Sequence, residues 1–213
     1  MNRPFTLAML CTLSAAGAAA DLHAVVRNAK GEPVADAVVI ATPQVAMPKP
    51  PRPKLEQVEQ IDQEFVPRVK AVLVGSPVSF PNHDDVRHHV YSFSAAKRFD
   101  LPLYVGTPTK PVVFDTPGVV TIGCNIHDWM VGYIYVSESP YFATTAADGQ
   151  AELAGLPAGR YSVRVWHPQL AGPEEATRRP LDLSGDAKLD WQLALKPEVR
   201  IRRAPAHGRR GPY

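Results

Sequence analysis

The chain has 213 residues, of which 45% are hydrophobic and 21% are charged, and this composition is typical of a globular protein with one large or two small domains. Two cysteines exclude a disulfide scaffold, and a net charge of +2 provides no overall field that would attract nucleic acid. The 22 prolines are about twice the usual share, which favours strands, turns and extended connectors over a helical protein.

The first 20 residues have the pattern of an export signal. Arg3 gives a basic start, residues 5–13 form an apolar run, and Ala18–Ala20 supply the small residues before a cleavage site at Asp21. The apolar run is too short to span a bilayer, and no later segment has the pattern of a transmembrane helix. We therefore expect an exported, periplasmic protein with no membrane span.

Residues 21–43 predict a strand, a turn at residues 30–33 and a second strand, because two β-branched apolar runs flank Lys-Gly-Glu-Pro. Residues 43–54 contain five prolines, and residues 44–54 predict an extended connector. Residues 55–62, rich in Glu and Gln, predict a short helix.

From residue 65 onward the sequence consists of short apolar runs separated by turn residues. Such spacing predicts an antiparallel β-sandwich or barrel. The expected strands are residues 70–73, 77–80, 89–93, 101–105, 111–114, 119–122, 131–136, 142–146, 151–153, 160–166 and 188–195. The basic segment 198–213 holds five Arg and one Glu, and it predicts a disordered tail or, alternatively, a tail that docks on an acidic partner or membrane surface.

The segment 123–130 carries the chemistry. Cys124, His127 and Met130 follow the spacing Cys-x2-His-x2-Met between two predicted strands. A thiolate, imidazoles and a weak axial thioether are the ligands that suit copper. Each of these residues alone has a simpler interpretation. Cys124 would be a small buried apolar residue, Met130 would fill the core, and His127 would be a surface loop residue. Zinc would fit Cys and His but leave Met130 unexplained.

A fourth ligand must come from elsewhere in the chain. His88 and His89 begin a predicted strand, where neighbouring side chains point to opposite faces, so only one of them can face the metal. We expect His88, with His89 and the loop residue His83 as alternatives. Asn125 and Trp129 are candidate neighbours of the metal, and Trp129 is either a hydrophobic shield or a packing residue.

With these motifs, residues 65–136 resemble the cupredoxins, the plastocyanin- and amicyanin-like copper proteins with a Greek-key β-sandwich. We place the cupredoxin-like domain at residues 55–137. The resemblance implies His88, Cys124, His127 and Met130 as the copper ligands. Cupredoxins usually have Asn directly after the upstream ligand, whereas this chain has His89. The chain also resembles exported proteins described as methylamine utilization proteins.

Residues 21–43 and 141–197 resemble the two halves of a carboxypeptidase regulatory-like domain, an immunoglobulin-like β-sandwich. The first half carries Gly31-x-Pro33, and the second carries the Asp148-Gly149 turn and the sequence Leu-Pro-Ala-Gly-Arg-Tyr at residues 156–161. This pattern predicts one sandwich interrupted by an inserted cupredoxin-like domain. The alternative is two small β pieces packed on the cupredoxin.

We expect a type 1 (blue) copper protein that passes single electrons between redox partner proteins, rather than an enzyme, since no Gly-x-Ser-x-Gly elbow, phosphate loop or His-Glu-x-x-His zinc motif occurs. Two alternatives remain open. The first is copper delivery or storage for the assembly of another metalloenzyme, and the second is a metal-free module that binds a protein or glycan.

Overall fold

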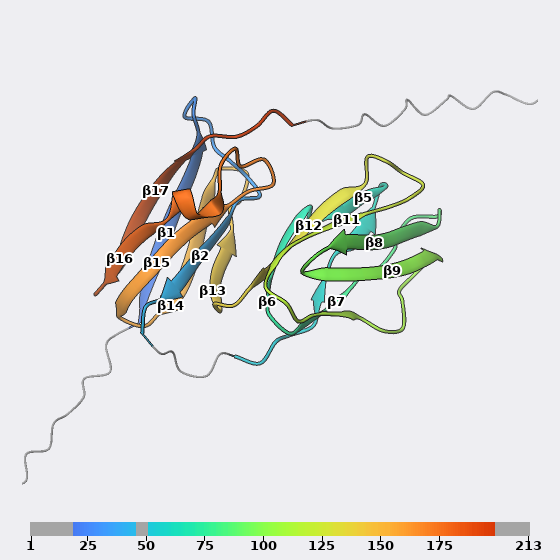
Figure 1. Cartoon of the computed structure of the whole chain (residues 1–213), viewed down its shortest axis with the longest axis horizontal. Helices are drawn as coiled ribbons and strands as arrows, with labels where there is room; N and C mark the ends of the chain where they lie inside the picture. The colour runs from blue at the N-terminus through green and yellow to red at the C-terminus, as the bar shows by residue number, and fades with distance from the viewer. Residues whose placement is uncertain (1–18, 46–50, 199–213) are drawn as a thin grey trace, which may run out of the picture.

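A computed structural model describes residues 19–45 and 51–198, and almost every regular element in them is a β-strand (Figure 1). Within these ranges one short 3-10 helix occurs, η1 (Glu174–Thr177). The prediction of an all-β fold is confirmed. In the described part of the chain, no helix is long and apolar enough to cross a membrane. Residues 1–18 of the predicted export signal, residues 46–50 of the Pro-rich connector and residues 199–213 of the basic tail lie outside the described residues.

Two sheets built from both ends of the chain form what we call the terminal sandwich. One sheet has the strand order β14–β1–β17 and the other has the order β13–β2–β15–β16. Side chains of both sheets fill a single core. The strands are β1 (Ala20–Asn28), β2 (Val38–Pro43), β13 (Tyr141–Thr144), β14 (Gln150–Leu156), β15 (Gly159–Trp166), β16 (Arg179–Leu183) and β17 (Ala187–Leu193).

The intervening residues form a second unit, the central sandwich. A five-stranded sheet of order β6–β12–β11–β8–β9 faces a three-stranded sheet of order β10–β7–β3, and β4 and β5 pair as a hairpin. These elements enclose a separate core. The strands are β3 (Glu56–Gln57), β4 (Glu59–Ile61), β5 (Glu64–Val66), β6 (Val69–Leu73), β7 (Ser76–Ser79), β8 (His88–Ser94), β9 (Lys97–Tyr104), β10 (Val112–Phe114), β11 (Gly118–Gly123) and β12 (Val131–Ser137).

The chain leaves the terminal sandwich after β2 and returns to it at β13, and these two strands are neighbours. Tyr141 at the start of β13 pairs with Ala41 near the end of β2, in antiparallel register. The whole central sandwich is therefore connected through two adjacent points of the terminal sandwich. An insertion at such a place leaves the host core intact, because its two ends already lie close together.

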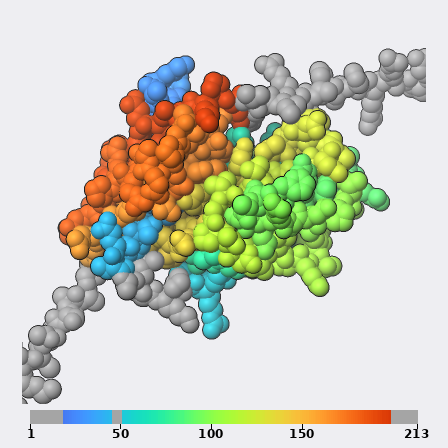
Figure 2. Space-filling view, in the orientation of Figure 1, coloured from blue at the N-terminus to red at the C-terminus, as the bar shows by residue number. Residues whose placement is uncertain are grey.

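The two sandwiches lie in contact with each other (Figure 2). Buried apolar residues of both form a shared layer between them. Strand β2 is buried on both faces: Val39 lies in the core of the terminal sandwich, whereas Val38 and Ile40 pack with Tyr135 of β12. A strand buried on both faces needs a continuous apolar sequence, which is what residues 37–41 provide. The Tyr135 hydroxyl also donates a 2.6 Å hydrogen bond to Glu174 of η1.

In β8 and β11, side chains alternate between the core and the outside, and this alternation determines which residues point inward at the candidate metal centre described below. In β11, Val120 and Ile122 are fully buried and Thr121 is exposed, so the next inward position after the strand is Cys124. In β8, His88 and Val90 are fully buried whereas His89 is only partly buried. These two strands neighbour each other in the five-stranded sheet, so their inward side chains face the same core.

The predicted short helix at residues 55–62 is wrong, because this segment forms β3 and β4. Val58 and Gln60 are buried while Gln57 is exposed, which is a period of two and not of 3.6. The segment pairs with β7 on one side and with β5 on the other. The sequence analysis also missed the hairpin partner β5, the edge strand β16 and the helix η1.

Candidate metal centre

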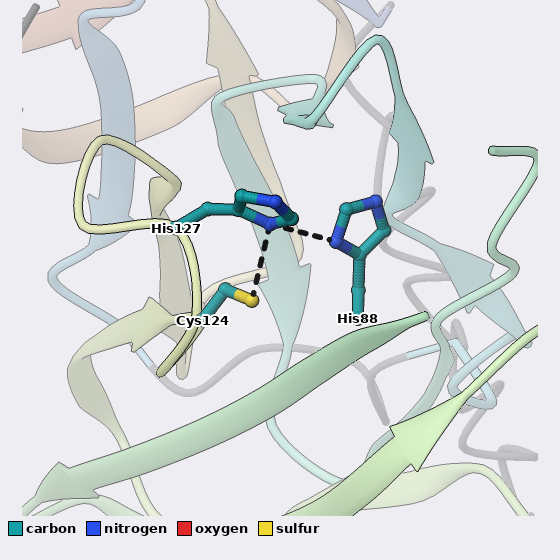
Figure 3. A group of neighbouring side chains, drawn as sticks. All are labelled: His88, Cys124 and His127. Carbon is teal, nitrogen blue, oxygen red and sulfur yellow. Dashed lines mark hydrogen bonds between the residues drawn. The ribbon is translucent and has the colours of Figure 1, made fainter. Parts of the chain in front are cut away.

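Three side chains from two parts of the central sandwich converge at one end of its five-stranded sheet (Figure 3). His88 opens β8, Cys124 follows β11, and His127 lies in the loop before β12. The Nδ1 atoms of His88 and His127 are 3.1 Å apart, and Cys124 Sγ lies 3.8 Å from His127 Nδ1. All three donor atoms lie within 4.8 Å of one another.

The loop from Cys124 to Met130 is tightly closed by its own backbone. The Met130 N–H donates to the carbonyl of His127 at 2.9 Å, and the Cys124 N–H donates to the carbonyl of Met130 at 3.3 Å. Gly123 and Val131 are paired across β11 and β12, so the loop spans the end of a regular antiparallel pair. This geometry explains how seven consecutive residues can direct two donors toward one point.

Burial within the cluster is uneven. His88 is fully buried, Cys124 is 4% exposed and His127 is partly exposed. Met130 is 1% exposed and belongs to the same core as Cys124, and its role as a ligand stays a prediction. Of the three clustered side chains, His127 is thus the most exposed one.

The neighbouring histidines have different partners. His89 points to the other side of β8, where its Nε2 pairs with the carboxylate of Asp100. His83 is exposed in the loop before β8, with its Nε2 3.8 Å from a carboxylate oxygen of Glu59. The structure thus brings His88, and not His89 or His83, to the side chains of Cys124 and His127.

Trp129 and Asn125 lie on the loop around this cluster. The ring of Trp129 is tilted against that of His127, with 5.1 Å between the ring centroids. The indole N–H of Trp129 is buried and has no hydrogen-bond partner among the described residues. Asn125 is exposed. Trp129 therefore covers one flank of His127, whereas Asn125 faces outward.

Sequence analysis did not single out Asp84, a close neighbour of the cluster. Asp84 Oδ2 lies 2.7 Å from His88 Nε2, the ring nitrogen that faces away from Cys124 and His127. Burial by itself would raise the pKa of Asp84, but hydrogen bonds from His88 and from the N–H groups of Gln63 and Asp62 outweigh it and lower that pKa. The carboxylate is thus held in its charged form beside His88.

Tyr104 is a second residue that the sequence did not indicate. Its hydroxyl donates to the carbonyl of Phe80 at 2.6 Å and accepts from the Gln60 side-chain amide at 2.6 Å. Burial raises the pKa of Tyr104 to about 12, the hydrogen bond from Gln60 acts in the opposite direction, and Cys124 adds to the rise. Tyr104 is paired with His88 across β8 and β9, so this polar group supports the strand that carries His88.

The donor set fits a metal ion that accepts both sulfur and nitrogen. Metal–nitrogen and metal–sulfur bonds of about 2.0 and 2.3 Å allow two donors of one ion to be at most about 4.3 Å apart. The His88–His127 and Cys124–His127 donor distances of 3.1 and 3.8 Å satisfy this limit, and the His88–Cys124 donor pair lies within 4.8 Å. A trigonal site of two His and one Cys with a weak axial Met is typical of copper electron-transfer sites.

In comparisons with known proteins, no family model and no curated protein matches this chain. Solved structures that resemble it include a purple cupredoxin from Nitrosopumilus maritimus, with 26% identity and a TM-score of 0.35 over 38% of this chain and 99% of that chain. A copper-containing nitrite reductase from Thermus scotoductus SA-01 has 26% identity and a TM-score of 0.38 over 46% of this chain and 25% of that chain. This chain thus spans about a quarter of that reductase. A mutant of amicyanin in its oxidized state has 19% identity and a TM-score of 0.36 over 38% of this chain and 81% of that chain.

Proposed function

We propose that this chain is a type 1 copper protein of the cupredoxin kind that passes single electrons between redox partners. The copper would be held by His88, Cys124, His127 and Met130. The observation that carries the proposal is the convergence of one thiol and two imidazole nitrogens inside a β-sandwich. Copper would supply the one-electron chemistry by cycling between its two oxidation states.

The surroundings of the site suit an electron carrier because they restrict the movement of the metal-binding side chains. Cys124 and His88 are anchored next to paired strands and are almost fully buried. If the metal-binding side chains keep their positions in both oxidation states, the reorganisation energy of electron transfer stays small. His127 is the one of the three that is partly exposed, so we assign it as the point where electrons enter and leave.

The test is a visible spectrum of the purified full chain during titration with Cu(II). We expect an intense thiolate-to-copper band in the unmodified protein. Cys124→Ser replaces the soft thiolate with a hydroxyl and should abolish the band while the β-rich circular dichroism spectrum is retained. A band that persists in Cys124→Ser would show that the site is elsewhere.

Two matched variants test the histidine assignment in the same titration. His88→Ala should remove or strongly weaken the band, because it deletes a buried donor, whereas His89→Ala should retain it, because His89 pairs with Asp100 on the opposite face. The reverse result would make His89 the ligand. A band kept in both variants would point to His83 or to a site without an upstream histidine.

Copper retention separates this function from copper delivery. A carrier with a buried thiolate should lose copper slowly to a strong chelator, and rapid reversible exchange would favour the delivery role instead.

The proposal also includes export to the periplasm by the segment 1–20. Processing before Asp21, read by mass spectrometry of the protein recovered from the periplasm, would test it.

The terminal sandwich forms the second part of the proposal. We propose that residues 21–43 and 141–197 make one regulatory-like domain into which the cupredoxin-like residues 55–137 are inserted. The adjacency of β2 and β13 and the single core shared by β1, β2 and β13–β17 support this division.

A further inference from the structure

The Asp84 carboxylate makes hydrogen bonds on two sides. Its Oδ2 lies 2.7 Å from His88 Nε2 and also accepts the Gln63 N–H at 2.8 Å, while its Oδ1 accepts the Asp62 N–H at 2.7 Å. An ionised carboxylate can only accept hydrogen bonds. His88 Nε2 is therefore the donor in its contact with Asp84, and Nδ1 is the ring nitrogen that faces His127 and Cys124 (Figure 3).

The donors from Asp62 and Gln63 come from an unusual backbone turn. These two residues join β4 to β5 and have φ values of 54° and 60°, a left-handed conformation that residues other than glycine rarely adopt. A two-residue turn of this kind fits the twist of a hairpin. Here it also directs two consecutive N–H groups at one carboxylate.

The loop that carries Asp84 is fixed as well. The Asp84 N–H donates to Asn82 Oδ1 at 2.9 Å, and the Asn82 side-chain amide donates to the carbonyls of Val86 and Tyr104, each at 2.9 Å. The backbone N–H of His83 donates to the carbonyl of Gln60 on β4. The carboxylate is thus held from the side of the hairpin and from the side of β9.

We propose that Asp84 is a positioning residue of the copper site, which fixes the His88 ring with Nδ1 toward the metal and favours Cu(II) over Cu(I). The inference rests on the proposed copper function. Its physical reason is that a negative charge on the far side of the imidazole makes the ring a stronger donor and stabilises the more highly charged ion. Asp84 should therefore lower the reduction potential of the site.

The chain contains its own control for this effect. His89, the next residue, pairs with the carboxylate of Asp100 on β9, and the Asp100 side chain is 72% exposed. Both pairs join an imidazole to an aspartate, but only the Asp84 pair includes a residue of the His88–Cys124–His127 cluster. Asp100→Asn is therefore the matched variant for Asp84→Asn.

The experiment uses the full chain and measures Cu(II) affinity, Cu(I) affinity and reduction potential. Asn keeps the shape of Asp but offers one acceptor oxygen to three donors. Asp84→Asn should lower Cu(II) affinity about 10–100-fold, lower Cu(I) affinity less, and raise the potential. The visible band at saturating copper should be retained. Asp100→Asn should change none of these quantities.

Three outcomes contradict the inference in different ways. If the unmodified chain shows no thiolate-to-copper band, the proposed function itself fails. If the band is present but Asp84→Asn behaves like Asp100→Asn, only the role of Asp84 fails. If Asp84→Asn lowers both affinities equally and leaves the potential unchanged, Asp84 merely supports the loop.

A measurement on the unmodified protein keeps the inference testable if Asp84→Asn does not fold. In the diamagnetic Cu(I) form, NMR of the His88 ring should show a slowly exchanging proton on Nε2 and none on Nδ1. A proton on Nδ1, or rapid exchange at Nε2, would overturn the assignment.

Discussion

Met130 combines two demands, because it is a fully buried core residue and also the predicted axial ligand. It is 1% exposed and lies in the core of the central sandwich together with Cys124. Its backbone closes the loop through hydrogen bonds with His127 and Cys124. The position of the residue is thus fixed by the fold, whether or not its sulfur contacts a metal.

Met130→Leu separates the two demands. Leu conserves volume, so the loss in the free energy of unfolding should stay below about 1.5 kcal/mol. Leu supplies no axial donor, and this should disfavour Cu(II), which demands more ligands, and raise the reduction potential while the visible band remains. Redox titration of the loaded protein measures this shift, and an unchanged potential would show that Met130 only fills the core.

At the residue level, the sequence indicated which side chains come together where the signal is local, and it gave no such indication for partners far apart in the chain. Cys124 and His127 lie three residues apart in one loop, so their spacing alone indicated that they come together. His88 and His89 were distinguished by strand periodicity together with the family pattern. Asp84 went unnoticed because a carboxylate in a polar loop resembles an ordinary turn residue, and two of its partners lie 21 and 22 residues upstream.

At the level of elements, apolar runs bounded by turn residues predicted most strands, but the segment 55–62 was misassigned. Glu and Gln have good helix propensity, so composition favoured a helix there. The pairing of β3 with β7 and of β4 with β5 overrides that local preference. The hairpin turn at Asp62 and Gln63 also lacks the usual glycine, which removed the sequence signal for it.

The turn at Asp148 and Gly149 shows how a single glycine holds an element in place. Gly149 has φ +75°, and its carbonyl accepts the Val26 N–H from β1 at 2.8 Å. A Cβ added at this position would lie 2.4 Å from the Val26 carbonyl oxygen. The backbone of β1 therefore approaches too closely for any side chain.

Gly149→Ala should destabilise the protein more than Gly31→Ala does. Gly31 has a similar φ of +82° but open space around it, so alanine there adds only the conformational penalty of about 1–2 kcal/mol. At Gly149 the same penalty is joined by the clash with β1. Urea unfolding of both variants measures the difference, and equal losses would mean that β1 moves away at little cost.

At the scale of the whole molecule, the two sandwiches are connected more closely than a simple insertion requires. Val38, Ile40 and Tyr135 are almost completely buried between them. Glu174 accepts hydrogen bonds from Tyr135 of the central sandwich and from Arg164 of the terminal sandwich, both at 2.6 Å. Separation would therefore expose apolar surface and leave Glu174 with one partner fewer.

We nevertheless predict that the terminal sandwich folds on its own. Its core is formed by its own seven strands, and the two ends left by excision of residues 45–138 lie next to each other, since Tyr141 pairs with Ala41. A short Gly/Ser linker should close this gap, because loop-closure entropy grows slowly with length. The excised chain should give a β-rich circular dichroism spectrum and unfold cooperatively.

Excision also exposes an apolar face of the terminal sandwich. Val38 and Ile40 become accessible to solvent when the central sandwich is removed, and this must be considered in the same experiment. A second excised chain with Ile40→Thr keeps a β-branched residue in β2 and makes that face more polar, so it should aggregate less and keep the same spectrum. Cooperative unfolding of either version supports an independent host domain. A disordered spectrum in both versions, with the full chain β-rich, would mean that the terminal sandwich depends on the central one for its fold.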